Sequence, residues 1–242
     1  MDKTPTVMVG APVRDRAWIL PTYLEHIYNL NYDKKKIILC FVINDSRDAS
    51  ESIINKWLAE YGEEYSSTIV VHCNQGQIPD ERTHYVREKI YHTLSIVRNK
   101  FLDTALRSRA DYLFSVDSDI LVQPETLNEL LKSDKDIVAA QIWNDASKRY
   151  PNILMKNKAG TIRHYFDFPK NSLFKCDVTG AVYLISRRVL EAGVRYGYHR
   201  QGEDITFCED AKAKRFTIWA NTSVCCDHIM NLAQLATFKK PG

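Results

Sequence analysis

The stretch that decides the fold is YLFSVDSDIL, residues 112–121. An apolar run ends there in Asp117-Ser118-Asp119, and Ile120-Leu121 follow directly. A run of this kind predicts a strand of a parallel sheet, because helices bury both faces of such a sheet. Ligands of these sheets bind beyond the carboxyl ends of the strands. The two aspartates therefore stand where an α/β protein places its ligand site.

Strands and helices alternate on either side of this stretch. Short apolar runs predict further strands at residues 6–9, 36–43, 67–71 and 136–143. Apolar residues at helical spacing predict helices at residues 17–30, 50–61, 86–101 and 124–131. After residue 180, we expect strands at residues 181–186, 216–219 and 224–228 and helices at residues 187–192 and 203–214. The repeated alternation predicts an α/β protein with a parallel, doubly wound sheet and helices on both faces.

The composition is that of an ordinary folded protein. Hydrophobic residues make up 45% of the 242 residues, and 33 basic against 30 acidic residues leave a formal net charge of +3. This excludes a disordered chain, and the small basic excess argues against a nucleic-acid partner. No uncharged apolar window reaches the roughly 18 residues that a membrane span needs, so we expect none. The start MDKTPTVMVG lacks the basic region of a signal peptide, and we expect a cytoplasmic protein.

The six cysteines and the chain length add two expectations. The cysteines form no CxxC pair, so we interpret them as small buried side chains of a reducing compartment rather than as zinc ligands. A chain of 242 residues can form one large domain or two small ones. Because it contains no internal repeat and no low-complexity linker, we expect a single domain over residues 1–242.

The acidic residues at strand ends are candidate ligands. If the backbone at Asp117 and Asp119 is extended, both carboxylates point the same way and can hold a divalent cation through oxygen. The alternative is a turn rich in Asp and Ser. Asn44-Asp45 ends the second strand, and its carboxylate can accept hydrogen bonds from a base or a ribose, or cap the following helix.

Further candidates lie in the second half and on the long helix. His228 is a metal ligand or a core histidine, and a nearby DxD that needs a third ligand favours the first reading. Glu203-Asp204 opens a helix, where the acids either stabilise its N-terminus or supply a general base. Arg98 is either solvated or turned to a phosphate or carboxylate. Trp143 ends a strand, where it stacks on a sugar or packs in the core.

Taken in order, these pieces resemble a glycosyltransferase of the GT-A fold, close to family 2. The first strand leads into APVRD, the second ends in NDSRDAS, and the helix carrying VRN precedes VDSDI, the DxD motif. The segment DVTGAVYLISRRVL is similar to the acceptor-side glycine strand, and GEDITFCEDAKAKRFTIWAN to the ED motif with its helix and strand. The PVRD start, the DxD strand and SDKDIVAAQIW also resemble the procollagen galactosyltransferase and Anp1 mannosyltransferase groups.

The resemblance implies a fold, a reaction and roles for residues. The fold would be one GT-A (Rossmann-like) domain, with a mostly parallel central sheet and a smaller mixed sheet on the acceptor side. About residues 1–120 would form the nucleotide-binding half and about residues 121–235 the acceptor half, with a tail at residues 236–242. The donor would be a nucleotide sugar, with a UDP-sugar expected. The acceptor hydroxyl would belong to a glycan, a protein or a lipid-linked molecule.

By the same resemblance, Mn2+ or Mg2+ would be held by Asp119, His228 and Asp117. Asp204 would deprotonate the acceptor, with Glu203 as a second candidate, and the displacement would invert the anomeric centre. His199 and Arg200 are candidates for diphosphate contacts. The nucleotide-sugar-binding residues would be Pro12, Val13, Arg14, Asn44, Asp45, Arg98, Asp117, Ser118, Trp143 and Gly180.

Three other classes compete with this interpretation. A DxD phosphatase needs its nucleophilic aspartate after the first strand of the core, whereas the DxD follows the fourth predicted strand here. A sugar nucleotidyltransferase opens with a Gly-rich phosphate loop, whereas GAPVRDR contains one glycine. The third class is a non-catalytic module that binds nucleotide sugars, and turnover of a donor separates it from the enzyme.

Overall fold

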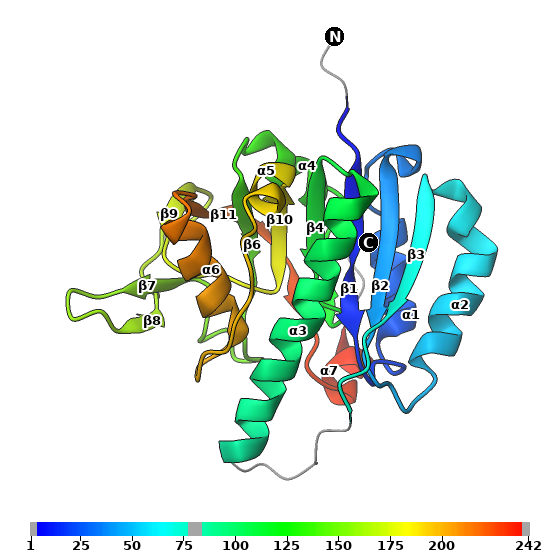
Figure 1. Cartoon of the computed structure of the whole chain (residues 1–242), viewed down its shortest axis with the longest axis horizontal. Coiled ribbons are helices and arrows are strands. Elements are labelled where there is room, and N and C mark those ends of the chain that lie inside the picture. The colour runs from blue at the N-terminus through cyan, green and yellow to red at the C-terminus, as the bar shows by residue number, and fades with distance from the viewer. Residues whose placement is uncertain (1–3, 77–83, 239–242) are drawn as a thin grey trace.

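The computed structural model describes residues 4–76 and 84–238. Its main sheet has eight strands in the order β3-β2-β1-β4-β10-β6-β11-β9, and β5–β12 and β7–β8 form two small pairs (Figure 1). The strands are β1 Val7–Val13, β2 Ile37–Ile43, β3 Ser67–His72, β4 Tyr112–Val116, β5 Ile120–Leu121, β6 Ile137–Gln141, β7 Leu154–Lys156, β8 Ile162–His164, β9 Leu173–Cys176, β10 Val182–Ser186, β11 Ile218–Cys225 and β12 Asp227–His228. The helices are α1 Leu20–Tyr28, α2 Ser50–Tyr61, α3 His84–Ser108, α4 Thr126–Lys132, α5 Arg187–Glu191, α6 Glu203–Ala213 and α7 Leu232–Thr237, with short 3-10 turns at Lys34–Lys36 and Gly62–Glu64.

The central sheet is mostly parallel, as predicted. Strands β1 to β4 run parallel to one another, and β6 and β11 are parallel to each other. Strand β10 lies between β4 and β6 and is antiparallel to both. The six strands β1 to β4, β6 and β11 therefore all run in the same direction. The strands of the second half therefore complete the same sheet, with β9 as its antiparallel edge. The carboxyl ends of the six parallel strands consequently meet at one edge.

Helices cover both faces of the sheet, as the alternation predicts. One apolar cluster packs α1, α2 and α4 against residues such as Val7 and Val9 of β1. The other packs α3, α5 and α6 against residues such as Met8 and Cys40. Figure 1 shows α3 and α6 on the face toward the viewer. Neighbouring residues of β1 thus belong to opposite clusters, which fixes the register of the central strands.

The first strand is longer than predicted. The apolar run was expected to end before Gly10, but β1 continues through Gly10 and Pro12 to Val13. A Cβ on Gly10 would lie 1.7 Å from the carbonyl oxygen of Cys40, so only glycine permits this approach of β2. Proline is tolerated further along because β1 pairs with β4 only as far as Gly10.

The strand expected at residues 216–219 begins two residues later and is longer. Phe216 N donates to Ala211 O and closes the end of α6, after Arg215 has taken a left-handed conformation with φ of 69°. Strand β11 then runs from Ile218 to Cys225 and takes in the start of the strand expected at residues 224–228.

The cysteines and the apolar stripe of α3 agree with the sequence in part. All six cysteines are free, and four of them are buried as predicted, whereas Cys73 is half-buried and Cys225 is exposed. No helix among the described residues is long and apolar enough to cross a membrane. The side chain of Val86, predicted to begin the apolar stripe of α3, lies outside the described part of the chain, but Val97 and Phe101 of that stripe are buried.

Candidate active site

The DxD segment is a tight turn at the carboxyl end of β4. Ile120 N donates to Asp117 O at 2.9 Å, and Asp117 N donates to Ala181 O at 2.9 Å, which ties the turn to the start of β10. The expectation of extended backbone is therefore wrong. Asp117 contacts Arg98 of α3, whereas Asp119 contacts Arg16, so the two carboxylates have different partners. Ser118 between them is buried.

Asp119 and His228 lie next to each other because β5 pairs with β12. In this pair His228 is opposite Ile120, and Ile229 N donates to Asp119 O at 2.9 Å. Asp119 Oδ1 is consequently 3.9 Å from His228 Nε2. The other ring nitrogen, Nδ1, is 3.3 Å from Trp143 O. A proton on Nδ1 would face that carbonyl and leave the lone pair of Nε2 directed toward Asp119.

The two side chains of this pair are close enough to share one divalent cation. Two ligands that each bind one ion at about 2.1 Å lie at most about 4.2 Å apart, and the observed 3.9 Å is within that range. The carboxylate oxygen suits Mn2+ or Mg2+, whereas an imidazole is more often a ligand of Zn, Cu, Fe or Ni. The described residues contain no group of three or more His, Cys, Asp or Glu that could hold an ion. An ion at this pair would therefore take its other ligands from water or from a bound phosphate.

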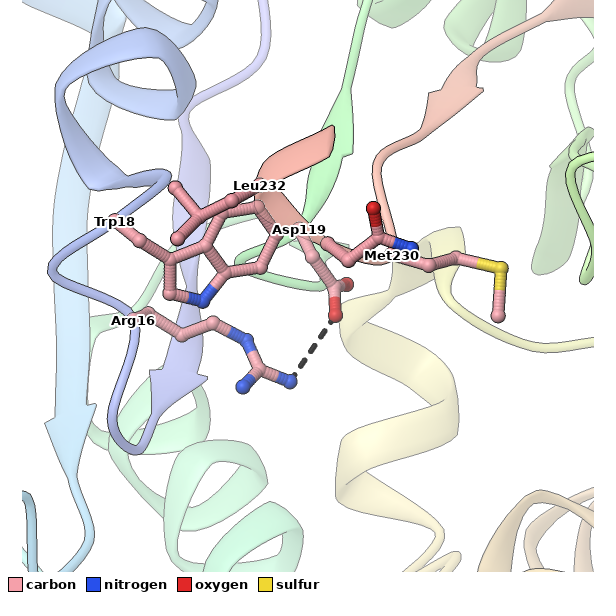
Figure 2. Close-up of a pocket in the computed structure, with 6 residues that line it drawn as sticks. Arg16, Trp18, Asp119, Met230 and Leu232 are labelled. Atoms are coloured by element: carbon pink, nitrogen blue, oxygen red, sulfur yellow. Dashed lines mark hydrogen bonds and ion pairs between the residues drawn. The ribbon is translucent and has the colours of Figure 1, made fainter. Parts of the chain in front are cut away.

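A cavity of about 300 Å³ adjoins Asp119. Figure 2 shows Arg16 and Trp18, from the segment after β1, and Met230 and Leu232, from the segment after β12, around the carboxylate of Asp119. Arg16 Nη2 donates to Asp119 Oδ2 at 3.1 Å. The cavity thus combines one cation, one carboxylate, an aromatic ring and apolar side chains, as small-molecule sites commonly do.

Arg98 connects the DxD turn to the ED segment. Its Nε donates to Glu203 Oε1 at 2.7 Å, and its Nη2 donates to Asp117 Oδ2 at 2.9 Å. Arg98 and Glu203 are both buried. Burial alone would lower the pKa of Arg98, but the charges of Asp117, Glu203 and Asp204 outweigh it and hold the pKa well above its usual value. Of the alternatives for Arg98, the structure shows a guanidinium turned to carboxylates, since it binds two.

Asp204 lies beside this network with a contact of its own. Its Oδ1 accepts a hydrogen bond from the Tyr183 hydroxyl at 2.5 Å, and its Oδ2 packs against Gly180. The pKa of Asp204 is raised from 3.8 to about 7, mainly by burial and then by the charge of Glu203, while Arg98 opposes both effects. A carboxyl group whose pKa is near neutrality is suited to act as a general base.

The loop after β2 shows whether Asp45 caps the following helix. Helix α2 begins at Ser50, and its first N–H donates to Asp48 Oδ1 at 2.9 Å. Asp45 instead accepts from Gln75 N at 2.6 Å, which ties its loop to the segment after β3. The alternative that Asp45 caps the helix is therefore wrong. Asn44 is buried beside it.

Other predicted residues occupy the same edge or its surroundings. Pro12 and Val13 end β1, and Arg14 follows them with a buried Nη1 that has no partner among the described residues. Trp143 is half-buried against Phe168, with ring centroids 6.1 Å apart. His199 is half-buried and Arg200 exposed, on the loop before α6. The edge thus brings together the predicted residues from β1, β2, β4 and the segment before β10.

Sequence reasoning missed Tyr183, Arg16 and Trp18. Tyr183 lies within the apolar run AVYLIS, where only its hydroxyl distinguishes it from a core side chain. Arg16 and Trp18 directly follow the PVRD segment that was singled out. Their proximity to Asp119 depends on how the chain turns after β1, which no residue pattern shows.

Sequence comparison finds relatives that are named as glycosyltransferases or as a subunit of a mannan polymerase. The family model described as Anp1 matches residues 1–168. A glycosyltransferase 25 family member of Anopheles gambiae is 28% identical over 148 residues, which are 60% of this chain and 25% of the relative. Procollagen galactosyltransferase 2 of Homo sapiens is 28% identical over 144 residues, 58% of this chain and 23% of the relative. The Mannan polymerase II complex anp1 subunit of Schizosaccharomyces pombe is 23% identical over 149 residues, 57% of this chain and 35% of the relative. The chain therefore spans about a quarter of the length of the first two relatives.

Solved structures share the fold. The structure of GalNAc-T7 with UDP, GalNAc and Mn2+ matches with a TM-score of 0.68 at 10% identity, over 97% of this chain and 45% of that one. The mannosyltransferase PcManGT from Pyrobaculum calidifontis, with GDP-Man and Mn2+, matches at 0.60 and 16% identity, over 95% and 58%. TarS of S. aureus with UDP-GlcNAc matches at 0.59 and 13% identity, over 97% and 62%. At such identities the likeness establishes the fold alone, and it confirms the predicted GT-A architecture.

Proposed function

The chain belongs to the Anp1 family, and from this premise we propose that it is a metal-dependent glycosyltransferase that moves a sugar from a nucleotide sugar to an acceptor hydroxyl. One observation carries the proposal: the pairing of β5 with β12 places His228 Nε2 3.9 Å from Asp119 Oδ1, although His228 lies outside residues 1–168 that the family model matches. The relatives named galactosyltransferase and mannan polymerase subunit support the reaction class.

In this proposal Asp119 and His228 hold Mn2+ or Mg2+, and Asp117 faces the ribose or the ion. An ion held by these residues would supply positive charge that offsets the charge of the departing diphosphate. Three buried guanidinium nitrogens without a partner among the described residues belong to Arg14, Arg16 and Arg98. Unpaired buried donors cost stability, and the oxygens of a diphosphate would satisfy them.

The base of the reaction is assigned to Asp204. Its pKa of about 7 allows a substantial ionised fraction at neutral pH while retaining affinity for a proton. Glu203 is buried in its ion pair with Arg98, which argues against this role for Glu203. Asp204 would deprotonate the acceptor hydroxyl, whose oxygen then displaces the nucleoside diphosphate with inversion at the anomeric carbon.

The donor is proposed to be a UDP-sugar. Matching structures contain UDP in GalNAc-T7 and UDP-GlcNAc in TarS, while PcManGT contains GDP-Man. Asp45, Asn44 and the segment from Pro12 to Arg14 would contact the nucleoside, and Trp143 would stack on a sugar. The acceptor is a glycan, a protein or a lipid-linked molecule.

Thermal unfolding in the presence of candidate donors tests the proposal. The full chain would be mixed with UDP, GDP and CDP sugars, each with and without Mn2+. A ligand that binds the folded state raises the unfolding temperature according to its occupancy. We expect the largest rise with a UDP-sugar and Mn2+ together. If no nucleotide sugar raises it under either condition, the proposed function is wrong.

A further inference from the structure

Tyr183 contacts Asp204, the base of the proposed reaction. It lies in β10 between Ser115 of β4 and Ala139 of β6, and it is fully buried. Its ring packs against Phe207 of α6, with centroids 5.8 Å apart. Because both neighbouring strands and the helix confine the ring, the hydroxyl has a fixed place. It donates to Asp204 Oδ1 at 2.5 Å, the length of a strong hydrogen bond to a carboxylate.

The other oxygen of Asp204 is confined from the opposite side. A Cβ added to Gly180 would lie 2.2 Å from Asp204 Oδ2, so any larger residue would displace the carboxylate. The peptide of Gly180 is itself held, since its carbonyl accepts from Val182 N at 2.9 Å and from Asn152 Nδ2 at 3.0 Å. The described residues contain no donor to Oδ2. The two oxygens of one carboxylate therefore have different surroundings.

From this asymmetry we infer that Tyr183 is a positioning residue, which holds Asp204 Oδ1 so that Oδ2 accepts the proton of the acceptor hydroxyl. The inference rests on the proposed function and adds which oxygen of Asp204 takes the proton. An oxygen that already accepts a short hydrogen bond is the weaker base, whereas Oδ2 has no protein donor in the described part of the chain. Gly180 then serves to leave room for that oxygen.

The acceptor oxygen forms a bond to the anomeric carbon of the donor, and the bond from that carbon to the diphosphate oxygen breaks. The electron pair of the broken bond leaves with the nucleoside diphosphate. The proton of the acceptor hydroxyl moves to Asp204 Oδ2 and passes to water after the product departs. No oxidant or reductant takes part.

The charge on Asp204 depends on groups from every element that faces it. These are Glu203 and Cys208 of α6, Arg98 of α3, Asp117 after β4, Tyr183 of β10 and Tyr196 before α6. The Tyr183 hydrogen bond lowers the pKa of Asp204 against the larger raising effects of burial and Glu203. Removing the hydroxyl should therefore raise the pKa of Asp204 further.

The test compares the Tyr183→Phe variant of the 242-residue chain with the wild type. The change keeps the ring and removes only the hydroxyl. We expect kcat to fall about 10- to 100-fold, because a misplaced reacting group loses that much, with the KM for the donor unchanged. The acid limb of the kcat pH profile should move upward by about one pH unit. Tyr65→Phe is the matched control, since the Tyr65 hydroxyl is buried, has no partner among the described residues and lies away from this edge.

A second measurement separates this inference from the proposed function. The pKa of Asp204 would be followed by carbon-13 NMR of labelled aspartate carboxyls, with Asp204→Asn to assign the signal. We expect this pKa to be higher in Tyr183→Phe than in the wild type. If the wild type transfers sugar while the variant keeps the same pKa, kcat and acid limb, the inference is overturned and the proposed function stands. If the wild type transfers no sugar from any donor, the proposed function fails even where the variant raises the pKa.

Discussion

Arg98 Nε donates to Glu203 Oε1 at 2.7 Å, and this ion pair joins α3 to α6 inside the protein. Only 8% of the Arg98 side chain and 5% of the Glu203 side chain are exposed. The same guanidinium reaches Asp117 of the DxD turn. One buried cation therefore holds two acidic segments that lie far apart in the sequence, and it fixes where Asp204, the neighbour of Glu203, enters the site.

Replacing Arg98 with Met should destabilise the protein strongly. Removing one partner of a buried ion pair leaves an uncompensated charge, which typically costs about 3–5 kcal/mol. The free energy of unfolding would be measured by urea denaturation. The control is Arg195→Met, because Arg195 pairs with Asp103 through side chains that are 38% and 37% exposed. Such a surface pair should contribute about 1 kcal/mol or less. Equal losses in the two variants would contradict the buried network.

Asp204→Asn should remove sugar transfer and leave donor binding intact. A positioned general base contributes about 100- to 10,000-fold to the rate, and the amide cannot accept the proton. The rate of transfer and the donor affinity would be measured separately. Glu209→Gln is the control on the same helix, because Glu209 forms a half-exposed ion pair with Lys156. Full activity of Asp204→Asn would reject the assignment of the base.

The same variant should change how stability depends on pH. The pKa of Asp204 is raised to about 7 in the folded protein, so between about pH 4 and pH 7 the folded state keeps a proton that the unfolded chain releases. The free energy of unfolding therefore falls as pH rises through this window, and the full loss is present above it. Asp204→Asn should lose less stability between about pH 4 and pH 8. Identical pH dependence in urea denaturation would show that this pKa is not raised.

His228→Ala should weaken the Mn2+-dependent binding of UDP, as should Asp119→Ala. Both changes remove one of the two side chains assigned to the ion, while the contacts to the nucleoside stay. Isothermal calorimetry with UDP, with and without Mn2+, measures this. His92→Ala is the control, since His92 is an exposed residue of α3. An unchanged affinity for UDP with Mn2+ in either site variant would refute the metal assignment.

Much of the fold could be predicted because the spacing of apolar residues indicates which side chains are buried. Helix α2 and strand β4 have the predicted bounds, 50–61 and 112–116. The end of β1 could not be predicted, because Gly10 and Pro12 read as a break, and the strand continues only because β2 approaches the glycine. The single domain over residues 1–242 and the cytoplasmic location stay predictions.

The site could be predicted as a set of strand-end residues but not as a geometry. The DxD and His228 stand at the ends of apolar runs, Arg98 lies beside the apolar stripe of a helix, and Asp204 opens a helix, so each could be named as a candidate. Which carboxylate faces which partner depends on the turn at residues 117–120. The hydrogen bond from Tyr183 to Asp204 depends on β10 lying antiparallel beside β4, and no local sequence pattern predicts that pairing.

The most direct test of the central claim is turnover. Release of nucleoside diphosphate from a panel of nucleotide sugars would be measured with Mn2+ and with chelator, for the wild type and for Asp119→Ala. We predict release from a UDP-sugar that requires the metal, accelerates with a suitable acceptor and disappears in the variant. Binding of nucleotide sugars without any release would identify a non-catalytic module, and release of phosphate from simple phosphomonoesters would identify a phosphatase. Either result would contradict the assignment of this chain as a glycosyltransferase.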